Sequence, residues 1–302
     1  MSEQSALPGR HPEMRLVCLG FGYSARAFLR AVRPGAVTGT TRSPEKADAL
    51  HQSGIRSIVY DGGSSPSLSE AIRSATHVLV SAGPGPGGDP FRFHFERDIA
   101  NAPDLAWIGY LSTIGVYGDH GGAVVDERTL CVPTADRGLW RLEAEDAWFA
   151  LGRRIDVPVG VFRLAGIYGP GRSPLVSLKE GRAKRIIKPG QVFNRIHVED
   201  IAQTLVASIA RPARRYYNVA DNEPAPPQDV IEYAAGLMGM DPPPEIPFDE
   251  ADMSPMARSF YGDVKRVSNT RLRSELGVRL RYPTYREGLR ALWESGTWDN
   301  AS

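Results

Sequence analysis

The segment from Arg15 to Arg30 limits what this chain can fold into more than any other, because closely spaced glycines join a short apolar run to a helical pattern. The run Leu16–Leu19 is apolar at every position, which predicts a strand buried on both faces. The residues after the turn show the apolar clustering of a helix that packs on a sheet. Between the two, Gly20, Gly22 and Ala25 match the G-x-G-x-x-G/A spacing of a dinucleotide-binding turn.

Each small residue of this turn has its own role in binding a dinucleotide. The first glycine allows the tight turn, the second lets the backbone approach a pyrophosphate, and the third small residue lets helix and strand pack closely. An ordinary strand–turn–helix would show the same spacing, but this motif closes the first strand and further strand–helix units follow it. We therefore expect the cofactor to contact Gly20, Gly22, Tyr23, Ser24 and Ala25.

Strands alternate with helices as far as Leu164, which indicates a parallel sheet. After the first strand, apolar and β-branched runs predict strands at 36–41, 55–61, 76–82, 105–111, 157–164 and 216–219. Beyond Gly171 the rhythm changes and prolines accumulate. The predicted fold class is α/β: a doubly wound parallel Rossmann sheet with a smaller, mixed C-terminal substrate cap.

The predicted domain boundaries follow from this change of pattern. Residues 1–13 are polar and contain two prolines, which predicts a disordered tail. Residues 14–165 and 195–221 are expected to form the NAD(P)-binding Rossmann domain. Residues 166–194 and 222–302 are expected to form the substrate-binding cap.

The residues after the second predicted strand favour NADP over NAD. Folds that prefer NAD usually carry an acidic residue here, about 20 residues past the glycines, to hold the ribose 2′-hydroxyl. This chain has Thr41, Arg42 and Ser43 instead, with no acid before Glu45. A cation and two hydroxyl groups suit a 2′-phosphate, although Arg42 could equally be a solvated surface arginine.

Two later segments are candidates for further cofactor contacts. Asp61 ends the third predicted strand, where its carboxylate would accept a hydrogen bond from the adenine amino group; the alternative is a turn aspartate before two glycines. Ala82 and Gly83 begin a glycine- and proline-rich loop that reaches Gly88. Such a loop lets a nucleotide approach the backbone, and it would also serve as a flexible connector.

Charge and composition argue against several other classes of protein. The net charge of +1 gives no reason to expect a nucleic-acid partner. Cys18 and Cys131 are far apart in the sequence and suggest neither a disulfide framework nor a metal cluster, so no metal site is expected. No apolar run approaches the length of a membrane span, and the N-terminus lacks the apolar core of a signal peptide. We expect a cytoplasmic protein with a small-molecule substrate.

Six motifs occur in an order that resembles one superfamily. They are GFGYSA at Gly20, STIGVYG at Ser112, RLAGIYGPG at Arg163, RIHVEDIA at Arg195, YNVAD at Tyr217 and SNTRLRSELG at Ser268. The chain resembles the extended short-chain dehydrogenases/reductases, in particular the NAD-dependent epimerase/dehydratase group that acts on nucleotide sugars. Its short glycine pattern resembles that of the atypical bacterial branch. The resemblance implies a hydride-transfer cofactor, NADP or NAD, and a possible homodimer.

The resemblance implies a catalytic hydroxyl, a tyrosine and a lysine, of which only the first is present. Thr113 stands where the superfamily has its catalytic Ser/Thr. The YxxxK pattern aligns with Arg137 and Arg141, so both the tyrosine and the lysine have become arginine. Arg141 could still hydrogen-bond the nicotinamide ribose. Arg137 cannot replace the tyrosine, because a guanidinium does not exchange protons near neutral pH, but the two arginines could hold an anionic substrate such as a diphosphate or a carboxylate.

The remaining site residues are also implied by the resemblance. Tyr117 and Tyr168 are candidates for a displaced acid, while the alternative is that both pack or line the pocket. Leu164 is expected beside the cofactor, and Arg195 and His197 beside the substrate. His197 and Asp200 would alternatively order the start of a helix.

Two functions remain open from the sequence. The first is an NAD(P)-dependent oxidoreductase or epimerase/dehydratase-like enzyme that acts on a small, possibly nucleotide-linked sugar. The second is a protein that binds NADP(H) as a structural or sensing ligand without turnover. Retention of Thr113 favours the enzyme, whereas loss of the tyrosine favours the binding protein.

Overall fold

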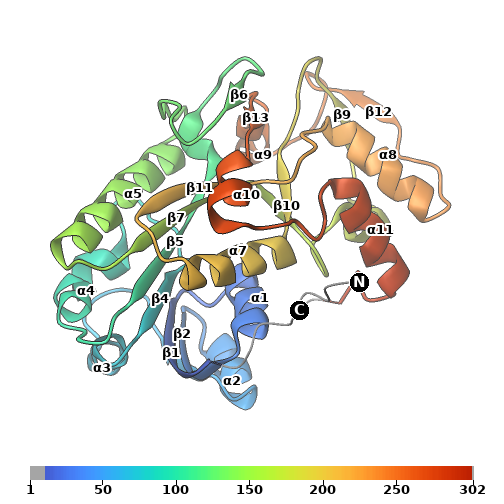
Figure 1. Cartoon of the computed structure of the whole chain (residues 1–302). Coiled ribbons are helices and arrows are strands. Elements are labelled where there is room, and N and C mark those ends of the chain that lie inside the picture. The colour runs from blue at the N-terminus through green and yellow to red at the C-terminus, as the bar shows by residue number, and fades with distance from the viewer. Residues whose placement is uncertain (1–10, 301–302) are drawn as a thin grey trace, which may run out of the picture. The chain divides into compact units, whose positions relative to one another are not determined.

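A seven-stranded sheet forms the centre of the fold in the computed structural model, which describes residues 11–300 (Figure 1). The strand order is β11-β7-β5-β4-β1-β2-β3. The strands are β1 (His11–Leu19), β2 (Pro34–Thr41), β3 (Arg56–Val59), β4 (His77–Val80), β5 (Trp107–Thr113), β7 (Val159–Leu164) and β11 (Arg215–Val219). β1 pairs in parallel with both β2 and β4, and β2–β3 and β4–β5 are parallel too. The predicted α/β doubly wound fold is confirmed.

Helices pack on both faces of this sheet. The connecting helices are α1 (Tyr23–Val32), α2 (Pro44–Gln52), α3 (Pro66–Arg73), α4 (Pro90–Ala100), α5 (Asp136–Arg154) and α7 (Val198–Ala210). Neighbouring residues of β5 point to opposite faces, as the two-residue period of a strand requires. Ile108 lies in the core shared with Trp148 of α5, whereas the ring of Trp107 lies 6.2 Å from that of Phe28 of α1.

The chain divides into two compact units, whose bounds differ from the predicted domain bounds in four segments. The first unit contains residues up to Ser112, Trp140–Arg163 and Ala202–Tyr217; the second contains Thr113–Leu139, Leu164–Ile201 and Asn218 onward. Residues 113–139, 164–165, 195–201 and 218–221 group with the second unit, whereas the sequence analysis places them in the Rossmann domain.

The second unit contains short elements around its own apolar cores. Its strands form the parallel pairs β8 (Gly166–Tyr168) with β10 (Arg195–His197), β9 (Arg185–Ile187) with β12 (Glu245–Pro247), and β6 (Val124–Val125) with β13 (Arg266–Val267). Its helices are η1 (Ile114–Tyr117), α6 (Pro174–Lys179), α8 (Pro227–Leu237), α9 (Pro255–Phe260), α10 (Thr270–Leu276) and α11 (Tyr285–Ser295). Tyr168, Leu175, Val230 and Leu289 share one of these cores.

Some local predictions differ from the observed elements. Most of the predicted tail lies outside the described residues, but His11–Glu13 form the start of β1. The third strand ends at Val59, so Asp61 lies beyond it in a turn. The glycine-rich loop is not an open connector, because Gly85 and Gly88 exchange two backbone hydrogen bonds of 3.1 and 2.9 Å.

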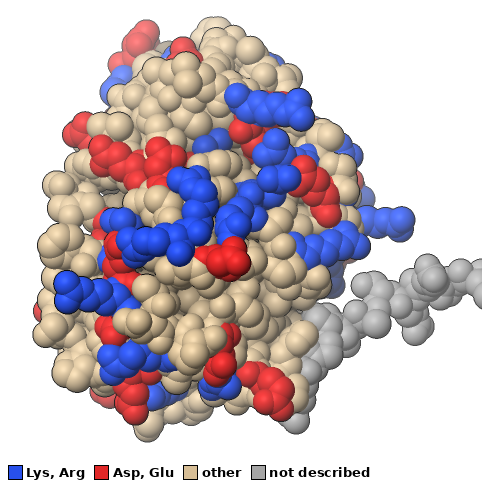
Figure 2. All heavy atoms as spheres, turned by 60° about the vertical axis from the view of Figure 1, so that its left-hand side comes forward, with Lys and Arg blue, Asp and Glu red and all other residues tan. Residues whose placement is uncertain are grey.

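Two surface properties of the described residues bear on possible partners. Among the helices of residues 11–300, none has both the length and the hydropathy of a bilayer span. Basic and acidic side chains lie intermixed on the face of the molecule in Figure 2, so that face carries no large area of one charge.

Candidate functional site

The glycine turn after β1 is held in place by the ends of two neighbouring strands. The Gly20 N–H donates to Thr40 Oγ1 at 2.7 Å, and the Phe21 N–H donates to the Thr40 carbonyl at 2.7 Å. From the other side, the Ser81 hydroxyl donates to the Gly20 carbonyl. Gly20 has φ of +89°, and a Cβ there would lie 2.7 Å from the Ala82 nitrogen. The first glycine is therefore required by the backbone itself.

The second glycine faces open space at the start of a helix. Gly22 is the N-cap of α1 in an extended conformation, and a Cβ there would meet no atom within 4 Å. No side chain caps this helix end, and its first turn carries no acidic residue. Ser24 and Ala25 are buried behind it, while Tyr23 is half-buried. An uncapped helix N-terminus attracts anions, so this end of α1 fits the pyrophosphate of a dinucleotide.

The segment after β2 leaves one arginine uncompensated. Arg42 is exposed, and within residues 11–300 no carboxylate forms an ion pair with it. The nearest acid in sequence, Glu45, accepts a hydrogen bond from the Ser43 hydroxyl, which also caps α2 by accepting from the Lys46 N–H at 3.3 Å. The same contact with Ser43 lowers the pKa of Glu45. Thr41 Oγ1 accepts a bond from the Ser43 N–H at 3.3 Å.

Two other predicted cofactor residues lie at the carboxyl ends of β3 and β4. Asp61 is exposed beside Gly62 and Gly63, both of which have positive φ. Gly83 is exposed, and a Cβ there would lie 2.9 Å from Nη2 of Arg141. The arginine guanidinium therefore packs against the backbone of the loop after β4.

Arg141 is engaged inside the first unit. Its Nη1 donates to the Leu111 carbonyl at the end of β5 and lies 3.4 Å from the Tyr110 hydroxyl. Together with its contact at Gly83, this arrangement ties α5 to the ends of β4 and β5. Arg141 thus has a structural role that the sequence did not predict.

A buried polar group that the sequence analysis did not assign lies one helical turn further along α5. Glu145 accepts hydrogen bonds from the Ser112 hydroxyl and from Arg163, whose Nη2 lies 2.7 Å from Oε2. Burial raises the pKa of Glu145, while the bonds to Arg163 oppose that shift. The four-residue spacing from Arg141 to Glu145 places both side chains on one face of α5. This spacing is the sequence signal that could have indicated that Glu145 points toward the sheet.

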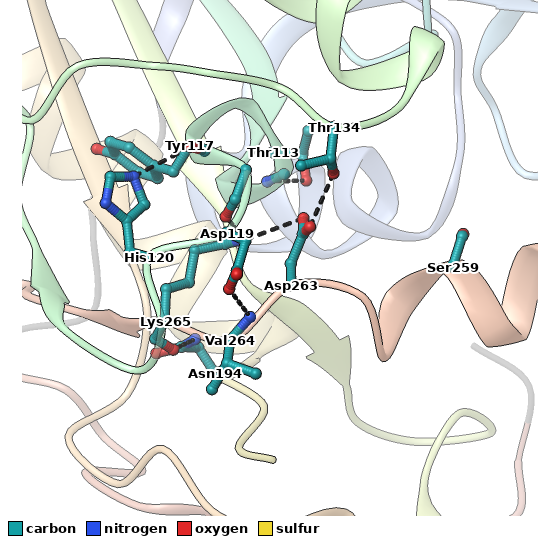
Figure 3. A network of polar contacts seen from close by, with 12 residues as sticks. Thr113, Tyr117, Asp119, His120, Thr134, Asn194, Ser259, Asp263, Val264 and Lys265 are labelled. Carbon is teal, nitrogen blue, oxygen red and sulfur yellow. Dashed lines mark hydrogen bonds and ion pairs between the residues drawn. The ribbon is translucent and has the colours of Figure 1, made fainter. Parts of the chain in front are cut away.

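Thr113, at the end of β5, belongs to the second unit and has a hydroxyl proton to donate. Its Oγ1 accepts the Gly115 N–H at 3.1 Å, which caps η1 (Figure 3). The side chain is half-buried. Because a hydroxyl both accepts and donates, this bond leaves its proton available to a substrate oxygen.

The hydroxyl of Tyr117 is engaged inside the second unit. Its side chain is fully buried, and its hydroxyl donates to Asn218 Oδ1 at 2.7 Å. The loop that follows is tied to the segment before β13, because Lys265 Nζ donates to the Gly118 carbonyl and to Asp263 (Figure 3). Burial lowers the pKa of Lys265. This geometry favours the packing role for Tyr117 over the role of a displaced acid.

The first turn of α5 lies against η1 and α9. A Cβ on Gly138 would lie 3.1 Å from the Gly115 carbonyl, so Arg137, the residue before it, lies near the segment that Thr113 caps. Nη2 of Arg137 donates to Ser259 Oγ at 2.8 Å, and its guanidinium lies 4.2 Å from the ring centre of Phe260.

The three remaining predicted substrate residues are mutually close on β8 and β10. Tyr168 and His197 pair across the two strands with ring centres 5.1 Å apart, and both are buried. Burial lowers the pKa of His197 to about 3, and its Nδ1 accepts the Glu199 N–H, so the neutral ring orders the start of α7. Arg195 donates to the carbonyls of Phe193 and Ala225.

Two carboxylates lie beside these strands. Asp200 accepts the N–H groups of Arg281 and Tyr282, so it joins α7 to the segment before α11. Asp221 is almost fully buried, and its N–H donates to the Arg195 carbonyl at 2.7 Å. Burial raises the pKa of Asp221 to about 7. This carboxyl group was not predicted as a site residue, and the sequence offers no local signal for its burial.

Similarity to other proteins extends over nearly the whole chain, although no family model matches it. Protein YeeZ of Escherichia coli K12 is 28% identical over 90% of this chain and 96% of its own length. The structure of a conserved protein of unknown function from Silicibacter pomeroyi is 51% identical, with a TM-score of 0.84 over 93% of this chain and 98% of that one. UDP-glucuronic acid 4-epimerase from Bacillus cereus, solved with NAD, has a TM-score of 0.70 at 17% identity over 92% of this chain and 95% of its own.

Solved NAD-dependent epimerase/dehydratase enzymes share the fold of this chain at 13–23% sequence identity, so the resemblance drawn from the sequence is confirmed at the level of the fold. The placement of Arg137 and Arg141 at the positions of the tyrosine and the lysine stays a prediction of the sequence analysis.

Proposed function

We propose that this chain binds a nicotinamide dinucleotide, with NADP preferred, and acts as an oxidoreductase or epimerase/dehydratase-like enzyme on a small, possibly nucleotide-linked sugar. The observation that carries the proposal is the start of α1, where Gly22 borders open space and no side chain caps the helix. A phosphate is the chemical group that such a helix end favours. The bound cofactor would supply or accept a hydride at the substrate carbon.

The preference for NADP rests on Arg42. Its guanidinium is exposed and, over residues 11–300, without a carboxylate partner, while Glu45 is held by Ser43. Arg42 would donate a charge-assisted hydrogen bond to a ribose 2′-phosphate. An acidic side chain at this position would instead repel the phosphate. Asp61, also exposed, is the proposed partner of the adenine amino group.

On the substrate side, we assign to Thr113 the task of orienting a substrate oxygen with its hydroxyl proton. Arg137 has donors but no proton to exchange near neutral pH, so it would bind an anionic part of the substrate and not act as the acid. Proton exchange would then use water, and turnover is expected to be slower than with a positioned acid by about 10²–10⁴-fold.

The second candidate function is a protein that binds NADP(H) without turnover. It is favoured by Arg137 at the position of the catalytic tyrosine and by the engagement of Arg141 with the Leu111 carbonyl. Both functions need the same cofactor site, so cofactor binding alone does not separate them.

One experiment tests the proposal and separates the two candidates. Calorimetric titration with NADPH and NADH measures cofactor affinity. Turnover of UDP- and other nucleotide-linked sugars is then followed both by cofactor absorbance and by chromatography of the sugar product, because an epimerase or dehydratase returns the hydride and leaves the cofactor absorbance unchanged. We expect NADPH to bind more tightly than NADH and one class of sugar to be turned over slowly. Tight NADPH binding with no turnover would support the second function, and no dinucleotide binding would refute both.

A further inference from the structure

The contact between the first turn of α5 and α9 holds Arg137 by two neighbouring side chains of α9. Its guanidinium stacks on the ring of Phe260, and one N–H donates to Ser259 Oγ. The Ser259 hydroxyl in turn donates to the Met256 carbonyl at 2.8 Å, so its lone pair is available to Arg137. The arginine is thus held in one orientation by a ring and a polar contact.

This arginine keeps most of its hydrogen-bonding capacity and its charge. A guanidinium has five N–H donors, and Ser259 takes one of those of Arg137. Across residues 11–300 no carboxylate forms an ion pair with it. Arg185 of β9 differs from Arg137 in this respect, because it forms ion pairs with Glu232 and Glu245.

Two exposed apolar side chains of α9 accompany this charge. Phe260 is 55% exposed and Met256 is 65% exposed, and their four-residue spacing places both on one side of α9. Exposed apolar groups that lie together and are rimmed by a polar group are characteristic of a binding surface.

We propose that Arg137, Phe260 and Met256 form a recognition site for an anionic group carried on a flat apolar body, such as an aromatic carboxylate or an aryl phosphate. The guanidinium binds the anion, and the ring of Phe260 and the side chain of Met256 contact the apolar part. The proposal rests on the proposed function in one respect, since it takes this anion to be part of the substrate.

The backbone beside Arg137 also adjoins the turn that Thr113 caps. A Cβ on Gly138 would lie 3.1 Å from the Gly115 carbonyl, and Gly115 donates its N–H to Thr113. The guanidinium of Arg137 itself is directed to Ser259 and Phe260 of α9.

The test uses ligand-observed NMR titrations of the full chain with benzoate, phenyl phosphate, acetate and the neutral isostere benzamide. Benzoate, phenyl phosphate or both should bind at least about tenfold more tightly than benzamide, the loss expected for one charge-assisted contact. Arg137→Gln should remove this advantage, and Arg137→Lys should retain part of it. Phe260→Ala should weaken the binding of benzoate but leave the binding of acetate unchanged. Arg128→Gln, which removes an exposed arginine of the same unit, is the matched control.

The outcomes separate this inference from the proposed function. Benzamide binding as well as benzoate, no binding of either anion by the wild type, or an unchanged anion affinity in Arg137→Gln would overturn the inference. Thermal unfolding of each variant shows whether it is folded. Phe260→Ala changes an exposed position, so its benzoate affinity gives a second test of the inference if Arg137→Gln does not fold. NADPH titration tests the proposed function separately, with Gly22→Val as an added variant. Gly22→Val should lose NADPH binding and keep benzoate binding.

Discussion

The two glycines of the turn after β1 should fail in different ways when they are substituted. Gly20 has φ of +89°, and a Cβ there would lie 2.7 Å from the Ala82 nitrogen, whereas a Cβ at Gly22 meets no atom within 4 Å. Gly20→Ala should therefore lower the free energy of unfolding of the protein. Gly22→Val should leave it folded and remove the space that a pyrophosphate needs.

The magnitudes follow from the local geometry. A non-glycine residue held at positive φ costs about 1–3 kcal/mol, and the forced contact with Ala82 adds about 1–3 kcal/mol. Together these amount to about 2–6 kcal/mol, a large part of the 5–15 kcal/mol that is typical of a folded domain. Gly22 has an extended backbone that valine can adopt, so Gly22→Val should cost about 1 kcal/mol through a poorer helix cap.

Denaturant unfolding of the ligand-free variants measures the first effect, and calorimetric titration with NADPH measures the second. We expect a lower unfolding midpoint for Gly20→Ala, and a near-normal midpoint without NADPH binding for Gly22→Val. Gly22→Ala is the matched control, because its smaller side chain should weaken NADPH less than valine does. The reasoning is refuted if Gly20→Ala is as stable as the wild type, or if Gly22→Val binds NADPH normally.

Three further predictions concern charge and proton transfer. Arg42→Ala should weaken NADPH about ten- to a hundredfold and leave NADH nearly unchanged in calorimetry, the loss expected for one charge-assisted contact; equal losses would contradict it. Thr113→Ala should depress turnover in the sugar panel without changing NADPH affinity; unchanged turnover would contradict this. Burial raises the pKa of Asp221 from its ordinary 3.8 to about 7. Between these two pH values the carboxyl group is protonated in the folded state and ionised in the unfolded state. Its contribution to stability is therefore complete below about pH 4 and is lost as pH rises through 7, by up to about 4 kcal/mol. Asp221→Asn should lack that fall when unfolding is measured at pH 5 and 8, and parallel profiles would contradict the assignment.

Much of the first unit could be predicted from the sequence, because its signals are local. Leu16–Leu19, Gly20 and Gly22 lie within a few residues of each other, so a strand, a turn and a helix start are each indicated by neighbouring side chains. The second unit was harder to predict. β8 and β10 contain three residues each, and such short strands show no detectable period.

Arg137 and Arg141 show the same difference between pattern and contact. The resemblance predicts that they replace a tyrosine and a lysine, and a guanidinium cannot take over proton exchange. Only the tertiary structure decided what each arginine does. Arg141 bonds to the Leu111 carbonyl, 30 residues earlier in the chain, and Arg137 bonds to Ser259, 122 residues later.

What the sequence determined by itself is thus the type of fold, the place of the glycine turn and the absence of the usual acid. What the tertiary structure decided is which polar groups are buried and with whom they pair. The hydroxyl of Tyr117 donates to Asn218, 101 residues later in the chain, and the carboxyl group of Asp221 is buried. The physical reason is that hydrogen bonding and desolvation act through space, between segments whose sequences carry no mark of one another.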